Sequence, residues 1–323
     1  KMMRKIMLIC CLLSLLTLNT HSNTVSGIAI NVHVTENISL SQESRNYLSD
    51  KVSQLLSENN VLGKNYSDRF YLLVNANVVE KNIVGGLPQR ISQKIEMTYK
   101  IGDAIDNIIY STYSQTYIGI GTTEIKSQIN AFSKVKSNTL YSHFLEEAKK
   151  RIIEFYSQQC ESIIQETEIY TQNKEYDKAI YKLSLIPHGV DCYSEALNQM
   201  RIVYSDKIGY ENQRLLDKAQ LAWNSKPNKE GAQIAIGYLE QMKTDKSNQK
   251  EIKKLLSSMN AKLQSDEEKE WEFMLEQYEQ EQVLKQQKEQ NDTDILNTCI
   301  QIGYDFLSKN LQPINIIKNI LLW

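Results

Sequence analysis

The histidines of this 323-residue chain are the first candidates for metal or acid–base chemistry. No two of them have the spacing of a helical zinc site: His21, His33, His143 and His188. His188, Asp191 and Cys192 are near neighbours in sequence and could surround a metal ion. A disulfide at Cys192 would take away the best ligand of that set. The sequence therefore predicts no metal site.

Other signs of catalysis are equally weak. No serine stands in a G-x-S-x-G pattern. Ile118–Gly121 (IGIG) lacks the third glycine and the lysine of a phosphate-binding loop, so a turn from sheet to helix explains it better. The acids of 266–270 (DEEKE) belong to a charged helical stretch with no sign of a pocket that would shift their pKa. We therefore predict neither catalytic residues nor a cofactor, and we expect a protein that is not an enzyme.

The first residues have the pattern of a secretory signal peptide, which we assign to residues 1–22. Three basic residues precede an apolar run, Ile6–Leu18, and small polar residues follow it. A membrane span needs roughly 20 apolar residues, so this run favours export over a membrane anchor. The residues before Cys10 and Cys11 are not small, which argues against lipoprotein anchoring.

The charge of the chain excludes one class of partner. Loss of the basic leader would take the formal net charge from −2 to −5. A mildly acidic chain without a basic cluster is unsuited to nucleic acid. We expect a periplasmic or outer-envelope protein, or a secreted one.

Residues 24–136 have the pattern of an α+β domain. Alternating apolar residues predict strands, and two capped amphipathic segments predict helices. The expected order is β-α-β-β-β-α, with a mainly antiparallel sheet. The strands are expected at 28–34, 70–80, 91–101 and 108–120, and the helices begin near Ser39 and, with a threonine cap, within 121–124.

Residues 137–262 are expected to be wholly helical. The segments are 140–158, 163–173, 175–187, 191–225 and 231–242. Tyr176 and Ala179, followed by a helix-ending Pro187, resemble the second helix of a tetratricopeptide hairpin. We interpret the region as two degenerate helical hairpins separated by a long helix.

Cysteine placement supports this layout. If 163–173 and 175–187 form an antiparallel pair, Cys160 and Cys192 lie at adjacent ends of it. In an exported chain this predicts a disulfide between them, with two buried free thiols as the alternative.

The tail, 263–323, combines a charged stretch with an apolar end. Residues 265–292 predict a long solvated helix with a sparse apolar line. Beyond it, Ile295, Cys299, Ile302 and Phe306 have heptad-like spacing. We expect this strip to dock on the helical region. A partner helix, self-association and a membrane surface are the alternatives.

Several of these features together resemble uncharacterised exported proteins of Bacteroidota. They are the leader, the strands FYLLVNANVVE and IEMTYKIGDAI, the GIGTTE helix start, the two cysteines and the closing QPINI. The first domain is also similar in topology to the TolB amino-terminal domain and to the curli secretion lipoprotein CsgG. No lipobox, propeller or pore-forming hairpin accompanies this similarity, so it implies no functional residue.

The sequence thus predicts a non-catalytic scaffold that binds proteins through its helical hairpins. A component of an outer-membrane secretion or assembly machine, with ring contacts through the α+β domain, is the alternative, and an enzyme is a third. The candidate interaction residues are Trp223, Tyr238, Ile295, Ile302 and Phe306.

Overall fold

The computed structural model describes residues 28–36, 39–62, 69–85, 87–244, 248–263, 268–287 and 292–310. The expected leader, 1–22, and the apolar end, 311–323, lie outside these residues. The chain divides into two compact units, 1–149 and 150–323. We describe each unit by itself.

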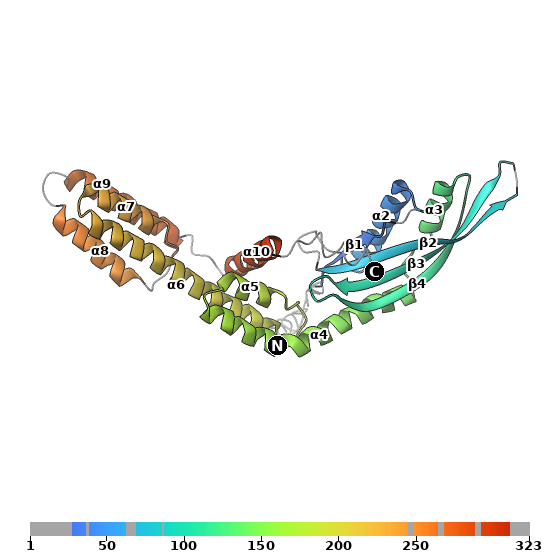
Figure 1. The fold of residues 1–323 in the computed structure, drawn as a ribbon, viewed down its shortest axis with the longest axis horizontal. Helices are drawn as coiled ribbons and strands as arrows, with labels where there is room; N and C mark the ends of the chain where they lie inside the picture. Colours follow the sequence, from blue (N-terminus) through green and yellow to red (C-terminus); the bar gives the residue numbers. More distant parts are fainter. Residues whose placement is uncertain are drawn as a thin grey trace, which may run out of the picture. The chain divides into compact units, whose positions relative to one another are not determined.

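A four-stranded mixed sheet with order β1-β2-β3-β4 organises the first unit (Figure 1). Strand β1 pairs in parallel with β2, and β2, β3 and β4 form an antiparallel meander. Because β1 is parallel to β2, their connection must cross over, and helix α2 makes this crossover. The bounds are β1 Ile30–Val34, α2 Gln42–Glu58, β2 Phe70–Val84, β3 Arg90–Asp103 and β4 Ile108–Gly121.

The helices of this unit cover one face of the sheet. Alternate residues of β3 share one face of the sheet. On the covered face, Gln93 forms a hydrogen bond with Ser127 of α3 (Glu124–Phe132). Tyr99, on the same face, packs edge-on against Tyr141 in the first turns of α4 (Thr139–Gln172). Helix α2 packs beside α3. The intervening residues of β3 and β4 are mostly exposed, which explains the alternation in the sequence.

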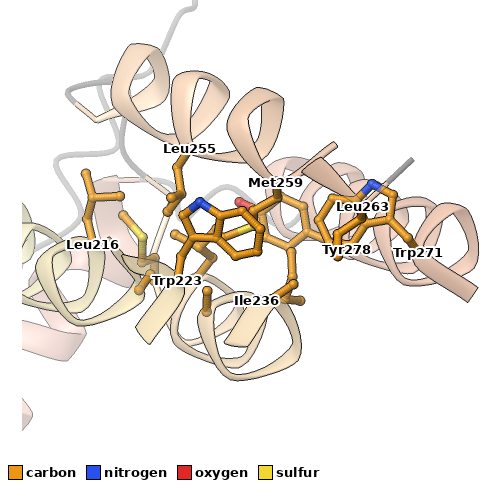
Figure 2. Packing of buried hydrophobic residues seen from close by; sticks show 13 residues of the cluster. Leu216, Trp223, Ile236, Leu255, Met259, Leu263, Trp271 and Tyr278 are labelled. Carbon is orange, nitrogen blue, oxygen red and sulfur yellow. The ribbon is translucent and has the colours of Figure 1, made fainter. Parts of the chain in front are cut away.

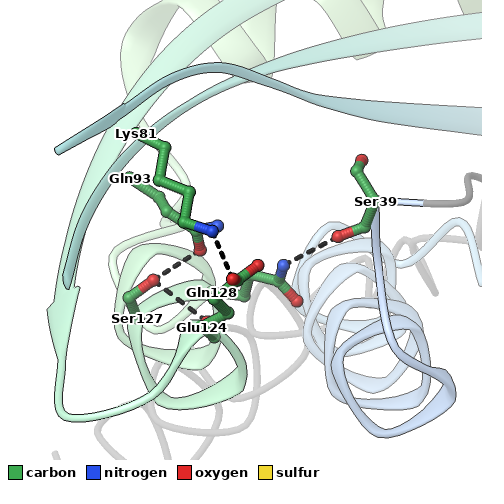
Figure 3. A network of polar contacts seen from close by, with 6 residues as sticks. All are labelled: Ser39, Lys81, Gln93, Glu124, Ser127 and Gln128. Atoms are coloured by element: carbon green, nitrogen blue, oxygen red, sulfur yellow. Dashed lines mark hydrogen bonds and ion pairs between the residues drawn. The ribbon is translucent and has the colours of Figure 1, made fainter.

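Polar contacts fix α3 to the sheet and to the turn before α2 (Figure 3). The Ser127 hydroxyl donates to the amide oxygen of Gln93, and Lys81 pairs with Glu124. The Gln128 side chain donates to the backbone oxygen of Ser39 at 2.9 Å. Ser127 and Gln128 are buried, so these bonds satisfy polar groups that would otherwise be costly to bury.

The second unit consists of helices in the part of the chain that the structure describes. They are the continuation of α4, then α5 Tyr176–Ser184, α6 Tyr193–Ser225, α7 Lys229–Glu240, α8 Gln249–Lys262, α9 Glu268–Gln287 and α10 Asp292–Asn310. Helix α6 packs against α5 through its middle, near Lys207 and Tyr210, and against α7 towards its end, near Trp223. The prediction of separate helices at 140–158 and 163–173 was wrong, because nothing between them is glycine or proline and α4 runs through unbroken.

One apolar cluster joins α6 to α9 (Figure 2). The Trp223 indole lies among Leu216, Ile236, Leu255 and Met259. The buried Trp271 and Tyr278 of α9 complete the cluster, so the expectation that this stretch is a solvated helix was wrong at these positions. Burial of the two rings outweighs the charge of the rest of the helix, which stays on the exposed side.

The structure confirms the α+β class and the order of the elements in the first domain. The cap of α3 at Thr123 is also confirmed, since its hydroxyl accepts the backbone N–H of Lys126. The cap of α2 is Ser41 and not Ser39. Among the described helices none has the length and apolar character to span a bilayer.

Candidate interaction surface of the helical unit

The second unit contains a pocket of ≈ 330 Å³. Its walls come from the α4–α5 turn, from α5 and α6, and from the Phe306 side chain of α10. It is lined by charged and aromatic side chains: Lys174, Glu175, Tyr176, Asp177, Lys178, Lys207, Tyr210, Glu211, Arg214 and Phe306. Pockets for whole small molecules span roughly 300–1,000 Å³. This one is at the small end, so it suits one or two side chains of a larger partner better than a complete cofactor.

The α4–α5 turn places the first lysine of the pocket. Helix α4 ends with paired bonds from the N–H of Glu175 to the oxygen of Tyr170 (2.8 Å) and from the N–H of Lys174 to the oxygen of Thr171 (2.9 Å). This arrangement puts Lys174 in the left-handed region, with φ 61°. Glycine is the usual residue at such a position, because a side chain is strained there. The lysine is therefore held at some conformational cost.

Tyr210 of α6 lines the pocket and has three other lining residues around its ring. Its ring lies 5.8 Å from that of Tyr176, measured between centroids. The Lys174 ammonium is 4.7 Å from the Tyr210 centroid, and the Arg214 guanidinium carbon is 5.8 Å from it. Cations near an aromatic face are attracted by its quadrupole, so the ring holds both basic side chains at the pocket.

Lys207 is the least exposed cation of the pocket. Its ammonium bonds Asp177 at 2.9 Å and Glu211 at 2.7 Å. Burial lowers the pKa of Lys207, but the hydrogen bonds and charges of Glu211 and Asp177 outweigh it and leave the pKa raised above its usual value. Lys207 therefore stays charged and ties α5 to α6, and it is not available as a base.

Helix α10 packs on α5 and α6, as the docking interpretation of the tail expects. The Phe306 ring stacks on Tyr181 at 5.1 Å, and Ile295 and Ile302 are half-buried. Gly303 allows this approach, since a Cβ there would lie 2.8 Å from the Ser184 hydroxyl oxygen. Of the predicted interaction residues in the tail, Phe306 alone lines the pocket.

Replacing Gly303 with leucine should release α10 and expose the Cys299 thiol. Cys299 is fully buried, and burial raises the pKa of its thiol to about 11, so it should resist alkylation. Overpacking at this site costs about 1–3 kcal/mol and lowers the free energy needed to open α10 by that amount. The thiol is then accessible more often, so iodoacetamide should modify Cys299 roughly tenfold faster in the variant. Peptide mapping by mass spectrometry measures the rate.

The matched control is Gly237→Leu on α7, where an added Cβ meets nothing within 4 Å. This variant should leave Cys299 as protected as in the parent protein. Equal protection in both variants would show that α10 does not depend on the close approach at Gly303.

The other two predicted interaction residues occupy different positions. Trp223 is buried in the apolar cluster, so its ring is not offered to a partner. Tyr238 is half-buried on α7, with the Lys218 ammonium 5.7 Å from its ring centroid. Sequence reasoning missed Lys174, Tyr210 and Arg214, because a helical stripe of charged residues is normally only a solvated surface.

The two predicted disulfide partners are bonded to each other, with their Cα atoms 6.5 Å apart. Cys160 lies within α4 and Cys192 immediately precedes α6. The His188 ring packs against Tyr193 at 5.1 Å. Across the described ranges no group of histidine, cysteine and acidic residues could hold a metal ion.

In the first unit, α3 and the residues just after it block part of the exposed edge of the sheet. The backbone N–H of Ile120 donates to the Asn130 side chain at 3.1 Å, and Lys134 donates to the oxygen of Ile118 at 2.6 Å. Side chains that occupy edge groups discourage the addition of another strand. This end of β4 is therefore poorly suited to strand pairing with a partner.

Comparison with protein-family models, with curated proteins and with solved structures gave no match. The resemblance to exported Bacteroidota proteins and to the TolB and CsgG domains therefore stays a prediction. The pocket must be interpreted from its own side chains.

Proposed function

We propose that this protein is a non-catalytic, exported interaction module whose helical unit binds a segment of a protein partner in the Tyr210 pocket. The observation that supports the proposal most is the half-buried Tyr176–Tyr210 ring pair inside a pocket that also carries charged groups. Tyrosine provides a large contact area with one polar end, and it is enriched at protein interfaces for that reason.

The chemistry of the lining favours binding over catalysis. The Lys207 ammonium is bonded to two carboxylates, and Lys178 bonds Glu175 at 3.2 Å. The described residues that line the pocket include no histidine, cysteine, serine or threonine that could act as a nucleophile or a proton carrier. Hydrogen bonds to these carboxylates leave the pKa of Lys178 and of Lys207 raised above its usual value, so both lysines stay charged. They can orient a partner but do not serve as bases near neutral pH.

Export is supported by the bond between Cys160 and Cys192, because disulfides persist mainly in oxidising compartments. The proposed location is the periplasm or outer envelope. The signal peptide predicted at residues 1–22 would direct the chain there.

Site-specific photocrosslinking tests the proposed site. A benzophenone-bearing phenylalanine in place of Tyr210 should form discrete crosslinked products in producing cells. The same residue in place of Lys253, which is exposed on α8, is the matched control and should not form them. Identical products from both positions, or none from Tyr210, would refute binding at this pocket.

A further inference from the structure

We infer that the pocket recognises the carboxylate of an acidic side chain in the partner segment, and that Lys174 and Arg214 contact it. The inference rests on the proposed function and specifies the chemistry of the partner. Three observations support it: which cations of the pocket lack an ion-pair partner, the strained backbone of Lys174, and the acidic residues that also line the pocket.

The cations of the pocket fall into two groups. Lys178 and Lys207 are already paired with carboxylates of the same unit. Lys174 and Arg214 have no carboxylate within ion-pair distance among the described residues, although both are held at the Tyr210 ring. Both residues are exposed and line the same pocket, so each can donate a charge-assisted hydrogen bond to an anionic group that enters it.

The backbone at Lys174 gives the second observation. Glycine adopts a φ of 61° at the end of a helix with the least strain, yet this chain has Lys174 at that position. Strain of this kind is often retained where a side chain is needed for function. The strained turn places the Lys174 ammonium 4.7 Å from the Tyr210 ring centroid, at the pocket.

The neighbouring acids restrict the kind of anion. Glu175, Asp177 and Glu211 also line the pocket. Their negative charges repel a phosphate group, which carries close to two charges, more than a carboxylate, which carries one. The Phe306 ring supplies an apolar contact beside the charged groups. We therefore expect an acidic residue next to an apolar one in the bound segment.

Fluorescence anisotropy with defined peptides tests this inference. The probe is the labelled peptide Gly-Ser-Gly-Glu-Leu-Glu-Gly-Ser-Gly, and its matched peptides have glutamine or lysine in place of glutamate. At low salt the acidic peptide should bind roughly tenfold more tightly than the glutamine peptide. Salt at about 0.5 M should remove most of this preference, because it screens exposed charges.

Variants assign the effect to the two cations. Lys174→Gln and Arg214→Gln should each weaken binding of the acidic peptide about threefold to tenfold, and Lys253→Gln, with the same change of charge, should not. Lys174→Gly should weaken binding equally while raising Tm by about 2–4 °C, since it relieves the strain at the turn. A residue with a purely structural role would not show this opposition.

The possible outcomes separate the two proposals. Equal affinity for the acidic and glutamine peptides, together with crosslinking at Tyr210, would overturn acid recognition and leave the interaction module standing. Absence of both crosslinking and peptide binding would overturn both. Inorganic phosphate that displaces the acidic peptide better than acetate does would overturn the carboxylate class.

Discussion

Loss of the Cys160–Cys192 disulfide should destabilise the helical unit by about 3–4 kcal/mol. The bond closes a loop with a sequence separation of 32, and closure of a loop of this size restricts the unfolded chain by about that amount. The double variant Cys160→Ala/Cys192→Ala should therefore unfold at a clearly lower urea concentration. Tryptophan fluorescence is the appropriate signal, because Trp223 and Trp271 are buried in the apolar cluster of the second unit.

Dithiothreitol provides the internal control for this experiment. It should shift the urea midpoint of the parent protein towards that of the double variant and leave the variant itself unchanged. Cys299→Ala controls for the removal of a thiol that forms no disulfide. If the midpoint of the parent does not move on reduction, the disulfide contributes nothing to stability.

Replacing Asp103 with alanine should destabilise the first unit by about 3–5 kcal/mol. Asp103 is fully buried and accepts a hydrogen bond from Arg69 Nε at 3.2 Å, while Arg69 itself is 7% exposed. The substitution would leave a buried positive charge without this partner, which is far more costly than loss of a surface pair. Asp103 also accepts the N–H of Ile105 at 2.8 Å and so shapes the turn before β4.

Hydrogen exchange of the β2–β4 amides, followed by mass spectrometry, measures this effect without interference from the helical unit. Glu96→Ala is the matched control, since Glu96 is an exposed acid of the same strand, and it should change exchange little. Asp103→Asn keeps an oxygen for the turn but loses the charge, so its effect should be intermediate. Exchange rates in Asp103→Ala equal to those in Glu96→Ala would disprove the role of the ion pair.

The strands and helices of the first unit could be predicted from the sequence, because the patterns that indicate them involve residues close together in the chain. The alternation in β3 reflects a sheet covered on one face, and the helix cap at Thr123 is a hydrogen bond over three residues. Such patterns remain visible in a single sequence. The length of β2, which continues to Val84, was underestimated because its last residues are paired but exposed.

Predictions that depended on which surfaces meet were less successful. Trp223 was expected to contact a partner, yet it is a core residue, because α7 and α8 come to cover it. Trp271 was assigned to a solvated helix for the same reason. An aromatic residue on the apolar face of a helix gives the same sequence pattern whether it packs against another helix of the chain or against a partner protein. The pattern therefore cannot distinguish the two cases.

The amino-acid sequence by itself determined the α+β class and the order of elements in the first domain, since these follow from periodicity and capping. It favoured the pairing of Cys160 with Cys192 over two free thiols, and the structure confirms the bond. Only the tertiary structure decided the pocket, because Lys174, Tyr210 and Phe306 come from segments far apart in the chain. Their proximity depends on how α4, α5, α6 and α10 pack, and packing is set by the fit of many side chains at once.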